Sequence, residues 1–141
     1  MSHIHSMPGH LIRRAQQVSN ALFAEECAAF DLTSVQYAAL TAIRENPGID
    51  ATRLCAVIAF DRSTIGDVLE RIEAKGWIRR TPSETDRRAR ILTLTAAGET
   101  LLRDVEPSVQ RVQQRLLEPF SKKEQATVLA LLERLARMGE G

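Results

Sequence analysis

Residues 61–95 read DRSTIGDVLERIEAKGWIRRTPSETDRRARILTLT, and the fold class follows from this stretch. It begins as a helix, because Asp61 is a residue type that caps helix N-termini and Gly76 is the type that most often ends them. Three aliphatic residues between them recur at the spacing of one buried helix face: Ile65, Leu69 and Ile72. The pattern therefore predicts a helix over residues 62–75.

A shorter helix precedes this one. Asp50 is placed to cap a helix over residues 51–58, and its apolar residues are predicted to point inward: Leu54, Cys55, Val57 and Ile58. A break at residues 59–61 separates the two helices. Two short helices joined by a three-residue turn form a helix-turn-helix.

After Gly76 the pattern changes from helical to extended. Residues 77–81 and 91–95 are rich in β-branched side chains, and they are separated by the polar, turn-forming residues 82–86 and by arginines. This pattern predicts a β-hairpin with a basic tip. A hairpin in this position is the wing of a winged helix-turn-helix domain, which we place at residues 33–95.

Capping signals also place the remaining helices. Thr33 with Gln36 and Ser121 with Glu124 have the spacing of capping boxes, and Thr95 is placed to cap the helix that follows the hairpin. The helices that begin at these caps are predicted over about 34–46, 96–118 and 122–138. The first helix is predicted over about 9–30 from the periodicity of its apolar residues.

The outer helices carry apolar stripes longer than a small winged domain can cover. Burying them against a second copy predicts a homodimer, with residues 9–32 and 96–141 as dimerisation helices and residues 1–8 as a flexible tail. The alternative is a monomer that folds these helices back on its own core. The predicted fold class is mainly α with a small β-hairpin wing, a winged helix-turn-helix with dimerising N- and C-terminal helices.

Composition agrees with a helical fold and points to an anionic partner. Hydrophobic residues make up 44% of the 141 residues but aromatic residues only 4%, which is typical of packed helices rather than of a sandwich or barrel. Residues 51–90 carry nine basic and six acidic side chains in a chain of net charge +1, so this is where an anion would bind. A solvated charged loop is the alternative interpretation of that charge.

Several classes of function are disfavoured. No run of about 18 apolar residues and no leader-like start stands out, so we expect a cytoplasmic protein without a membrane partner. Cys27 and Cys55 are too few for a disulfide framework or a zinc site. Because no metal-ligand set, Gly-rich phosphate loop or nucleophile beside a base stands out, we expect neither an enzyme nor a bound cofactor.

Four runs occur in a fixed order: DRSTI at 61–65, LERIEAKGWIRR at 69–80, DRRAR at 86–90 and LTAAG at 94–98. They resemble the signature of the MarR family of bacterial transcriptional regulators, and the resemblance spans roughly residues 10–138. The Asp-x-Arg motif followed by Leu-Thr and Gly is specific, because its spacing fixes a hairpin length as well as residue types. The resemblance implies a dimeric repressor or activator of transcription whose affinity for double-stranded DNA is altered by a small molecule or by oxidation.

The resemblance gives the wing a role in DNA binding. Arg88 matches the family arginine that enters the minor groove, and Asp86 would orient it through an ion pair. Arg87 and Arg90 would hold the flanking phosphates. A guanidinium suits a narrow, strongly negative minor groove, so the charge chemistry supports the same role.

The helix over residues 62–75 is the predicted recognition helix. Its exposed face is small and polar at the N-terminal end, so it can enter a major groove. Gly66 permits close approach to the duplex. Asp67 stands where the family more usually has a basic or neutral polar residue, and it would accept a hydrogen bond from cytosine or repel phosphates. The predicted DNA contacts from this helix are Arg62, Ser63, Thr64, Gly66, Asp67 and Arg71.

In the family, a small effector sits between the dimerising helices and the winged domain. The candidates for such a pocket are His10, Arg13, Arg14, Phe23, Tyr37 and Arg44. The arginines would suit a carboxylate and the rings an aromatic body. The run HLIRR at residues 10–14 also resembles family members that respond to aromatic acids or their coenzyme A thioesters. Alternatively, the rings belong to the core and the arginines are surface charges.

Two other functions are open at this point. Some family members are thiol redox sensors, but Glu25 and Glu26 lie beside Cys27 and would discourage a thiolate, whereas Cys55 is expected in the core. A winged module used only for protein contacts would lack wing arginines, which this hairpin has. The sequence favours a repressor that binds a pseudo-palindromic operator as a homodimer and is released by a small effector.

Overall fold

The computed structural model describes residues 3–86 and 88–139. Over these residues the chain forms six α-helices, one two-stranded antiparallel sheet and two short 3₁₀ helices at His3–Ser6 and Ala28–Phe30. The helices and strands are α1 (Pro8–Glu26), α2 (Ser34–Glu45), α3 (Ala51–Ile58), α4 (Arg62–Ala74), β1 (Ile78–Pro82), β2 (Arg90–Leu94), α5 (Ala96–Leu117) and α6 (Lys122–Arg137). The predicted winged helix-turn-helix is confirmed.

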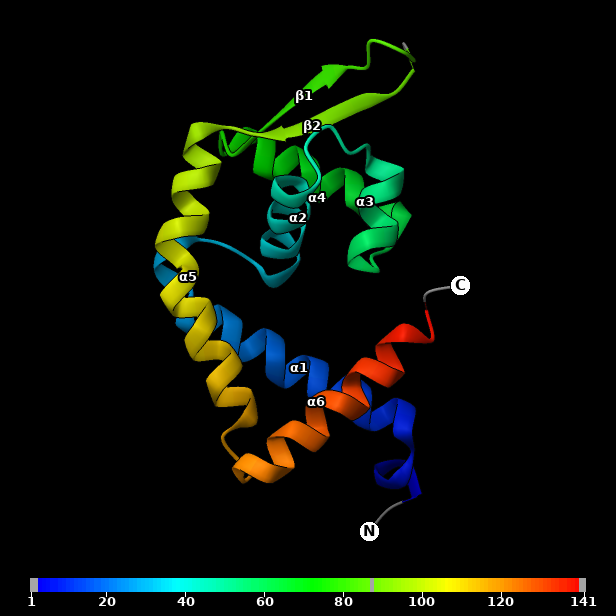
Figure 1. Ribbon diagram of the computed structural model, residues 1–141, viewed down its shortest axis with the longest axis vertical. Helices are drawn as coiled ribbons and strands as arrows, with labels where there is room; N and C mark the ends of the chain where they lie inside the picture. The colour runs from blue at the N-terminus through cyan, green and yellow to red at the C-terminus, as the bar shows by residue number, and fades with distance from the viewer. Residues whose placement is uncertain (1–2, 87, 140–141) are drawn as a thin grey trace.

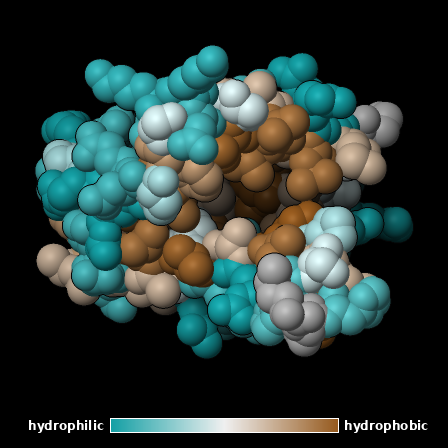
Figure 2. All heavy atoms as spheres, turned by 90° about the horizontal axis from the view of Figure 1, so that it is seen from below, coloured by the Kyte–Doolittle hydropathy of each residue, from teal (hydrophilic) through white to brown (hydrophobic). Residues whose placement is uncertain are grey.

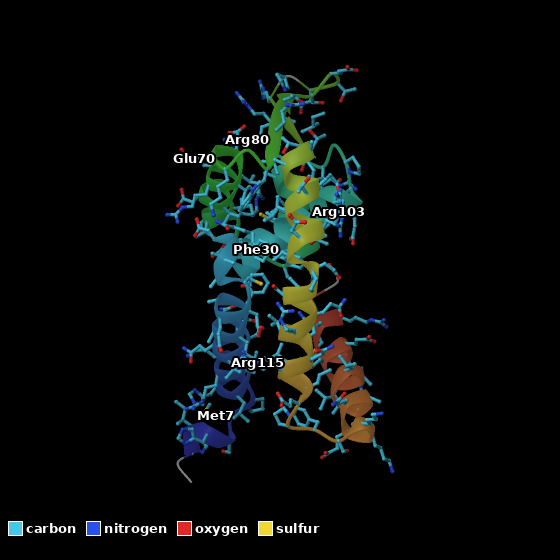
Figure 3. The ribbon with its side chains drawn as sticks, turned by 90° about the vertical axis from the view of Figure 1, so that its left-hand side faces the viewer. Met7, Phe30, Glu70, Arg80, Arg103 and Arg115 are labelled. Carbon is cyan, nitrogen blue, oxygen red and sulfur yellow. The ribbon has the colours of Figure 1, made fainter. Side chains whose placement is uncertain are left out.

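The molecule has two ends, which α5 connects (Figure 1). At the top of the view, α2, α3, α4 and the hairpin form the winged domain, whereas α1 and α6 lie at the bottom. Figure 3 shows α5 running beside α1, with Arg115 lying between them. Ion pairs join these helices: Arg111 Nε lies 3.1 Å from Glu26, and Arg115 Nη1 lies 3.3 Å from Glu25 and 3.4 Å from Glu26.

Local capping explains where most helices begin. Both predicted capping boxes are present, at Thr33 for α2 and at Ser121 for α6. The Asp50 carboxylate accepts a hydrogen bond from the backbone N–H of Arg53 at 2.8 Å and so caps α3. The predicted side-chain cap at Asp61 is wrong. Its backbone carbonyl, rather than its carboxylate, accepts the first N–H groups of α4, including that of Ile65 at 3.2 Å.

The first long helix is shorter than predicted. α1 ends at Glu26, and the chain passes through the 3₁₀ helix Ala28–Phe30 instead of remaining α-helical to Phe30. Asp31 then takes a left-handed conformation with φ of 50°, which its short polar side chain tolerates better than most side chains do. The periodicity of the apolar residues continues past Cys27, so sequence alone could not locate this end.

Aliphatic side chains from both strands and five of the helices fill the core. The largest fully buried ones are Leu40, Ile43, Leu54, Ile72, Leu92, Leu102, Val105 and Val112. Val57 is 56% exposed, so the prediction that it points inward is wrong, because Leu54 and Cys55 occupy the face of α3 that meets the core. By contrast, none of the residues of α6 is buried in the single chain. Within the described residues, no helix combines the length and the apolar character needed to cross a membrane.

The hairpin is fastened to the rest of the domain on both strands. β1 pairs with β2 from Ile78 opposite Leu94 to Pro82 opposite Arg90, so each strand is shifted by one residue from its predicted range. The backbone N–H of Leu92 donates to the carbonyl of Ile49 at 2.9 Å, which attaches β2 to the α2–α3 loop. The start of α5 packs equally closely, because a Cβ at Gly98 would lie 2.2 Å from the carbonyl oxygen of Trp77. This contact explains the glycine of the LTAAG run.

Candidate nucleic-acid interface

The exposed face of α4 carries all the residues predicted to contact DNA from the recognition helix. Ile65, Leu69 and Ile72 are buried, whereas the opposite face is open to solvent. The predicted contacts Arg62, Ser63, Thr64, Gly66, Asp67 and Arg71 are all exposed, and so are Glu70 and Ala74. No atom lies within 4 Å of where a Cβ would stand at Gly66, so the surface beside it is open.

The tip of the wing is shaped by backbone hydrogen bonds. The Asp86 carboxylate accepts the backbone N–H of Arg88 at 3.0 Å, and Ser83 Oγ accepts the N–H of Asp86 at 3.3 Å. Among the described residues no ion pair joins Asp86 to the Arg88 guanidinium, so the predicted ion pair is wrong. Asp86 instead fixes the backbone of the turn and leaves the guanidinium free. Arg87 lies outside the described residues.

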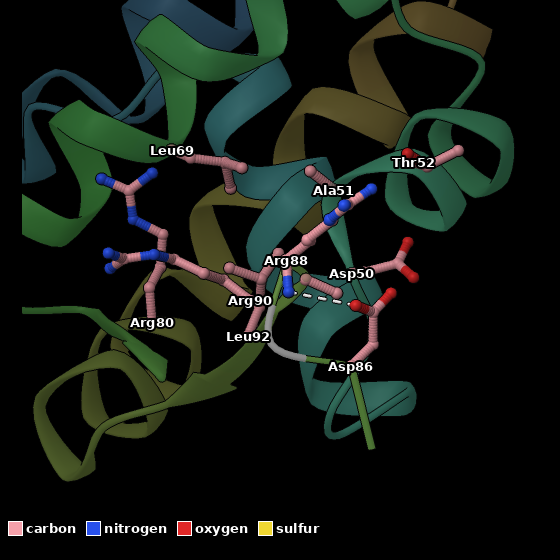
Figure 4. Close-up of a pocket in the computed structure, with 10 residues that line it drawn as sticks. Asp50, Ala51, Thr52, Leu69, Arg80, Asp86, Arg88, Arg90 and Leu92 are labelled. Atoms are coloured by element: carbon pink, nitrogen blue, oxygen red, sulfur yellow. Dashed lines mark hydrogen bonds between the residues drawn. The ribbon is translucent and has the colours of Figure 1, made fainter. Parts of the chain in front are cut away.

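A cationic cleft separates the wing from the helix-turn-helix (Figure 4). It encloses about 510 Å³ and is lined on the wing side by Arg80, Arg88 and Arg90. The start of α3 forms the other wall with Asp50 and Thr52. Figure 4 shows Arg88 extending toward the start of α3, whereas Arg80 reaches toward α4. Three guanidinium groups and two carboxylates, those of Asp50 and Asp86, line the cleft, so guanidinium groups are the larger part of its charged lining.

Arg80 is tied to α4 by an ion pair with Glu73. Its Nε and Nη2 donate to the same oxygen, Glu73 Oε1, at 3.1 and 2.7 Å. The hydrogen bond from Arg80 lowers the pKa of the Glu73 carboxyl, and the bond to Glu73 raises the pKa of Arg80. Arg88 and Arg90 have no such carboxylate partner among the described residues, and both are exposed. The cleft therefore contains one neutralised and two free guanidinium groups.

The single chain does not bring the six predicted effector residues together. Phe23 is buried and Tyr37 partly buried, with ring centroids 5.8 Å apart. Phe23 also lines an apolar cavity of about 350 Å³ between α1 and α2. Arg13 lies ten residues earlier on α1, which is about 15 Å along the helix axis. Arg14 and Arg44 are exposed, and only Phe23 of the six lines this cavity: His10, Arg13, Arg14, Tyr37 and Arg44 do not.

Sequence reasoning did not identify the polar edge of that cavity or the place of Arg80 in the lining of the cleft. Asn20 and Ser34 line the cavity and are joined by a hydrogen bond of 2.9 Å, although they are 14 residues apart. No short-range pattern marks such a pair. Arg80 was detectable in principle, because Glu73 and Arg80 carry opposite charges on either side of the turn at Gly76.

Both cysteines are buried. Burial raises the pKa of the Cys27 thiol, the neighbouring Glu26 raises it further, and Arg111 lowers it in part. A thiol of raised pKa is a poor nucleophile at neutral pH, which disfavours the redox-sensor alternative. Within residues 3–86 and 88–139, no group of three or more His, Cys, Asp or Glu side chains is placed to hold a metal ion.

These features define the class of the protein. The recognition helix exposes a small polar face, and Arg88 and Arg90 of the hairpin line a cationic cleft with no carboxylate partner among the described residues. Together the helix and the hairpin form a winged helix-turn-helix of the kind that binds DNA.

Comparisons with known proteins agree. Residues 30–89 match the model of the MarR family. The chain is 30% identical over 127 residues to the HTH-type transcriptional repressor NicR of Pseudomonas putida, across 90% of this chain and 80% of that protein. It resembles the transcriptional repressor CouR bound to a 23-mer DNA duplex, with a TM-score of 0.87 and 29% identity over 97% of both chains. It also resembles Bordetella bronchiseptica BpsR, whose DNA binding is regulated by 6-hydroxynicotinic acid, with a TM-score of 0.88 and 26% identity over 96% of this chain and 97% of that one.

The chain therefore belongs to the MarR family. It is a DNA-binding transcriptional regulator and not an enzyme.

Proposed function

We propose that this regulator is a repressor that binds a pseudo-palindromic operator as a homodimer and is released by a small aromatic acid. The observation that carries the proposal is the cationic cleft between the wing and the start of α3, whose lining includes Arg88 and Arg90, two exposed guanidinium groups with no carboxylate partner among the described residues. A relative that is a repressor and a solved relative regulated by an aromatic acid support the direction of control and the effector class.

The recognition helix α4 and the wing suit different grooves of one duplex. In our proposal the exposed face of α4 enters the major groove, where Ser63 and Thr64 bond bases or phosphates. Arg88 extends from the wing tip into the adjacent minor groove, and Arg90 binds a flanking phosphate. Arg62 and Arg71 are also exposed on α4 and add phosphate contacts. Asp67 and Glu70 are both exposed acidic residues of α4, and we assign Asp67 to a cytosine amino group.

An uncovered apolar groove supports the homodimer. It has a volume of about 390 Å³ and lies between α1, the end of α5 and α6, which Figure 2 shows from below as a hollowed hydrophobic surface. Leu131, Leu132 and Leu135 of α6 are 53%, 54% and 45% exposed. Contiguous apolar surface of this kind marks an interface, and a second copy with the same surface is the simplest cover. The two winged domains would then stand at opposite ends of the dimer.

The cavity between α1 and α2 is the proposed effector site. Its volume of about 350 Å³ is close to the lower limit for small-molecule sites, which is roughly 300 Å³. Phe23 and Leu32 provide an apolar wall for an aromatic ring, and Asn20, Thr33 and Ser34 provide hydrogen-bonding groups at its edge. His10, Arg13 and Arg14 lie on α1 beside the groove assigned to the second copy, so they would join an effector site only through the dimer.

Selection of DNA from a random pool tests the operator proposal. The purified protein is expected to enrich sequences with two inverted half-sites whose centres lie about 10 base pairs apart, because a symmetric dimer presents two recognition helices one helical turn apart. Footprinting of the enriched sequence should show protection of both half-sites. Recovery of single half-sites, or no enrichment over the starting pool, would contradict the proposal.

A thermal-shift assay tests the effector class. With 6-hydroxynicotinate, benzoate or 4-hydroxybenzoate at about 100 times its Kd, ligand binding should stabilise the fold by about 2.7 kcal/mol and raise Tm by several degrees. The same compound should release the selected operator. Asn20→Ala is expected to reduce both effects without altering operator binding in the absence of ligand. A compound that raises Tm but leaves the operator bound would be a ligand without a regulatory role.

A further inference from the structure

The pair Glu73–Arg80 spans the junction between the recognition helix and the wing. Glu73 lies in the last turn of α4, and Arg80 lies in the middle of β1, beyond the turn at Gly76, where φ is 80°. Arg80 lies four residue steps beyond Gly76, a length of roughly 13 Å in nearly extended chain. The ion pair therefore joins helix and strand well away from the turn that connects them.

Other hydrogen bonds hold the base of the hairpin, but they lie far from the point where Glu73 and Arg80 join α4 to the middle of β1. The N–H of Trp77 donates to the carbonyl of Ile72 at 3.1 Å, and Thr95 Oγ1 donates to the carbonyl of Gly76 at 2.6 Å. Both contacts lie close to the turn. The backbone of β2 is hydrogen-bonded to the α2–α3 loop at Ile49, and among the described residues no backbone hydrogen bond joins β2 to α4. Among the described residues, Glu73–Arg80 is the one ion pair between α4 and the hairpin.

We propose that Arg80 is a positioning residue for DNA binding, whose ion pair with Glu73 sets the angle between the recognition helix and the wing so that both enter neighbouring grooves of one duplex. The proposal rests on the DNA-binding mode proposed above. Two of the three Arg80 guanidinium nitrogens, Nε and Nη2, donate to Glu73, and the carboxylate offsets the positive charge of Arg80 there. Arg88 and Arg90, which have no carboxylate partner among the described residues, remain to contact DNA.

The direction in which one substitution changes operator affinity distinguishes a positioning role of the ion pair from a purely electrostatic one. Glu73→Gln removes a negative charge beside the DNA-binding cleft, so electrostatics alone would strengthen DNA binding. If the ion pair positions the wing, the same substitution should weaken binding to the selected operator about fivefold, because a neutral amide oxygen accepts the two Arg80 N–H groups less strongly than a carboxylate does and holds the strand less firmly. Glu73→Asp keeps the charge but is one methylene shorter, and it should weaken binding to a lesser extent.

The experiment measures Kd and groove protection for the full-length protein on the selected operator. For Glu73→Gln we expect hydroxyl-radical protection of the minor groove to be lost, while dimethyl sulfate protection of guanine N7 in the major groove persists. Arg79→Ala is the matched control, because it removes an exposed charge from the same strand and should change Kd by no more than about twofold. The Tm of each variant should stay within a few degrees of that of the wild type, as expected for a partly exposed ion pair.

Three outcomes would overturn the proposal: unchanged or tighter operator binding by Glu73→Gln, loss of protection in both grooves together, and a lowered Tm that accounts for the weaker binding. If the wild-type protein itself fails to select or protect an operator, the proposed function fails instead. The two failures are therefore distinguishable in one set of measurements.

Discussion

Arg88→Ala should weaken operator binding by about tenfold or more, with dimer and Tm unchanged. The side chain is exposed at the tip of the wing and is held by no carboxylate among the described residues. Its backbone N–H, by contrast, is fixed by Asp86 at 3.0 Å, so the hairpin turn survives the truncation. The loss should therefore appear in DNA binding and not in folding.

Fluorescence anisotropy across a range of salt concentrations is the appropriate measurement for this variant. Removing one cation from the DNA interface should reduce the slope of log Kd against log salt by about one. Arg103→Ala serves as the control, because Arg103 is exposed on α5 and does not line the cleft (Figure 3). Wild-type affinity in the Arg88 variant would remove the wing tip from the DNA-binding surface.

Leu132→Arg on α6 should abolish the dimer and weaken operator binding by about 100-fold or more, because two weak half-site contacts would no longer be linked. Leu132 is 54% exposed in the single chain and lines the apolar groove between α1, α5 and α6. A guanidinium placed at the centre of a buried apolar interface would lose its hydration without gaining a partner. The helix itself should tolerate the change, since arginine is a good helix former.

Light scattering coupled to size-exclusion chromatography reports the state of the protein, and anisotropy reports its Kd for the operator. Ala130→Arg introduces the same charge on the opposite side of α6 and should remain dimeric with wild-type affinity. A wild-type protein that elutes as a monomer, or a Leu132 variant that stays dimeric and binds normally, would refute the assignment of this groove to a second copy.

The elements that the sequence predicted correctly depend on signals only a few residues long. The capping boxes at Thr33 and Ser121 need a partner three residues away, and both appear where the sequence places them. The buried stripe of Ile65, Leu69 and Ile72 needs only the helical period. Two of the predictions that failed concern choices between two local options. Asp61 had to cap α4 with either its carboxylate or its backbone, and Asp86 had to bond either a guanidinium or a backbone N–H.

The residues of the candidate site divide in the same way. The exposed face of α4 and the arginines of the wing follow from periodicity and turn chemistry, so they could be named from the chain alone. The six effector candidates do not line one cavity of the single chain, and Phe23 and Arg13 lie on one helix yet far apart along it. Asn20 and Ser34 meet at the cavity edge only because α1 and α2 fold against each other.

The amino-acid sequence alone determined the order of the helices, the faces they bury and the basic character of the hairpin, since these depend on residues within about one or two helical turns of each other. Tertiary structure alone decided which charges pair and which stay free. Arg80 is neutralised by Glu73 while Arg88 is not, because the left-handed turn at Gly76 folds the strand back along α4 and brings only the first of these guanidinium groups within hydrogen-bonding distance of that carboxylate.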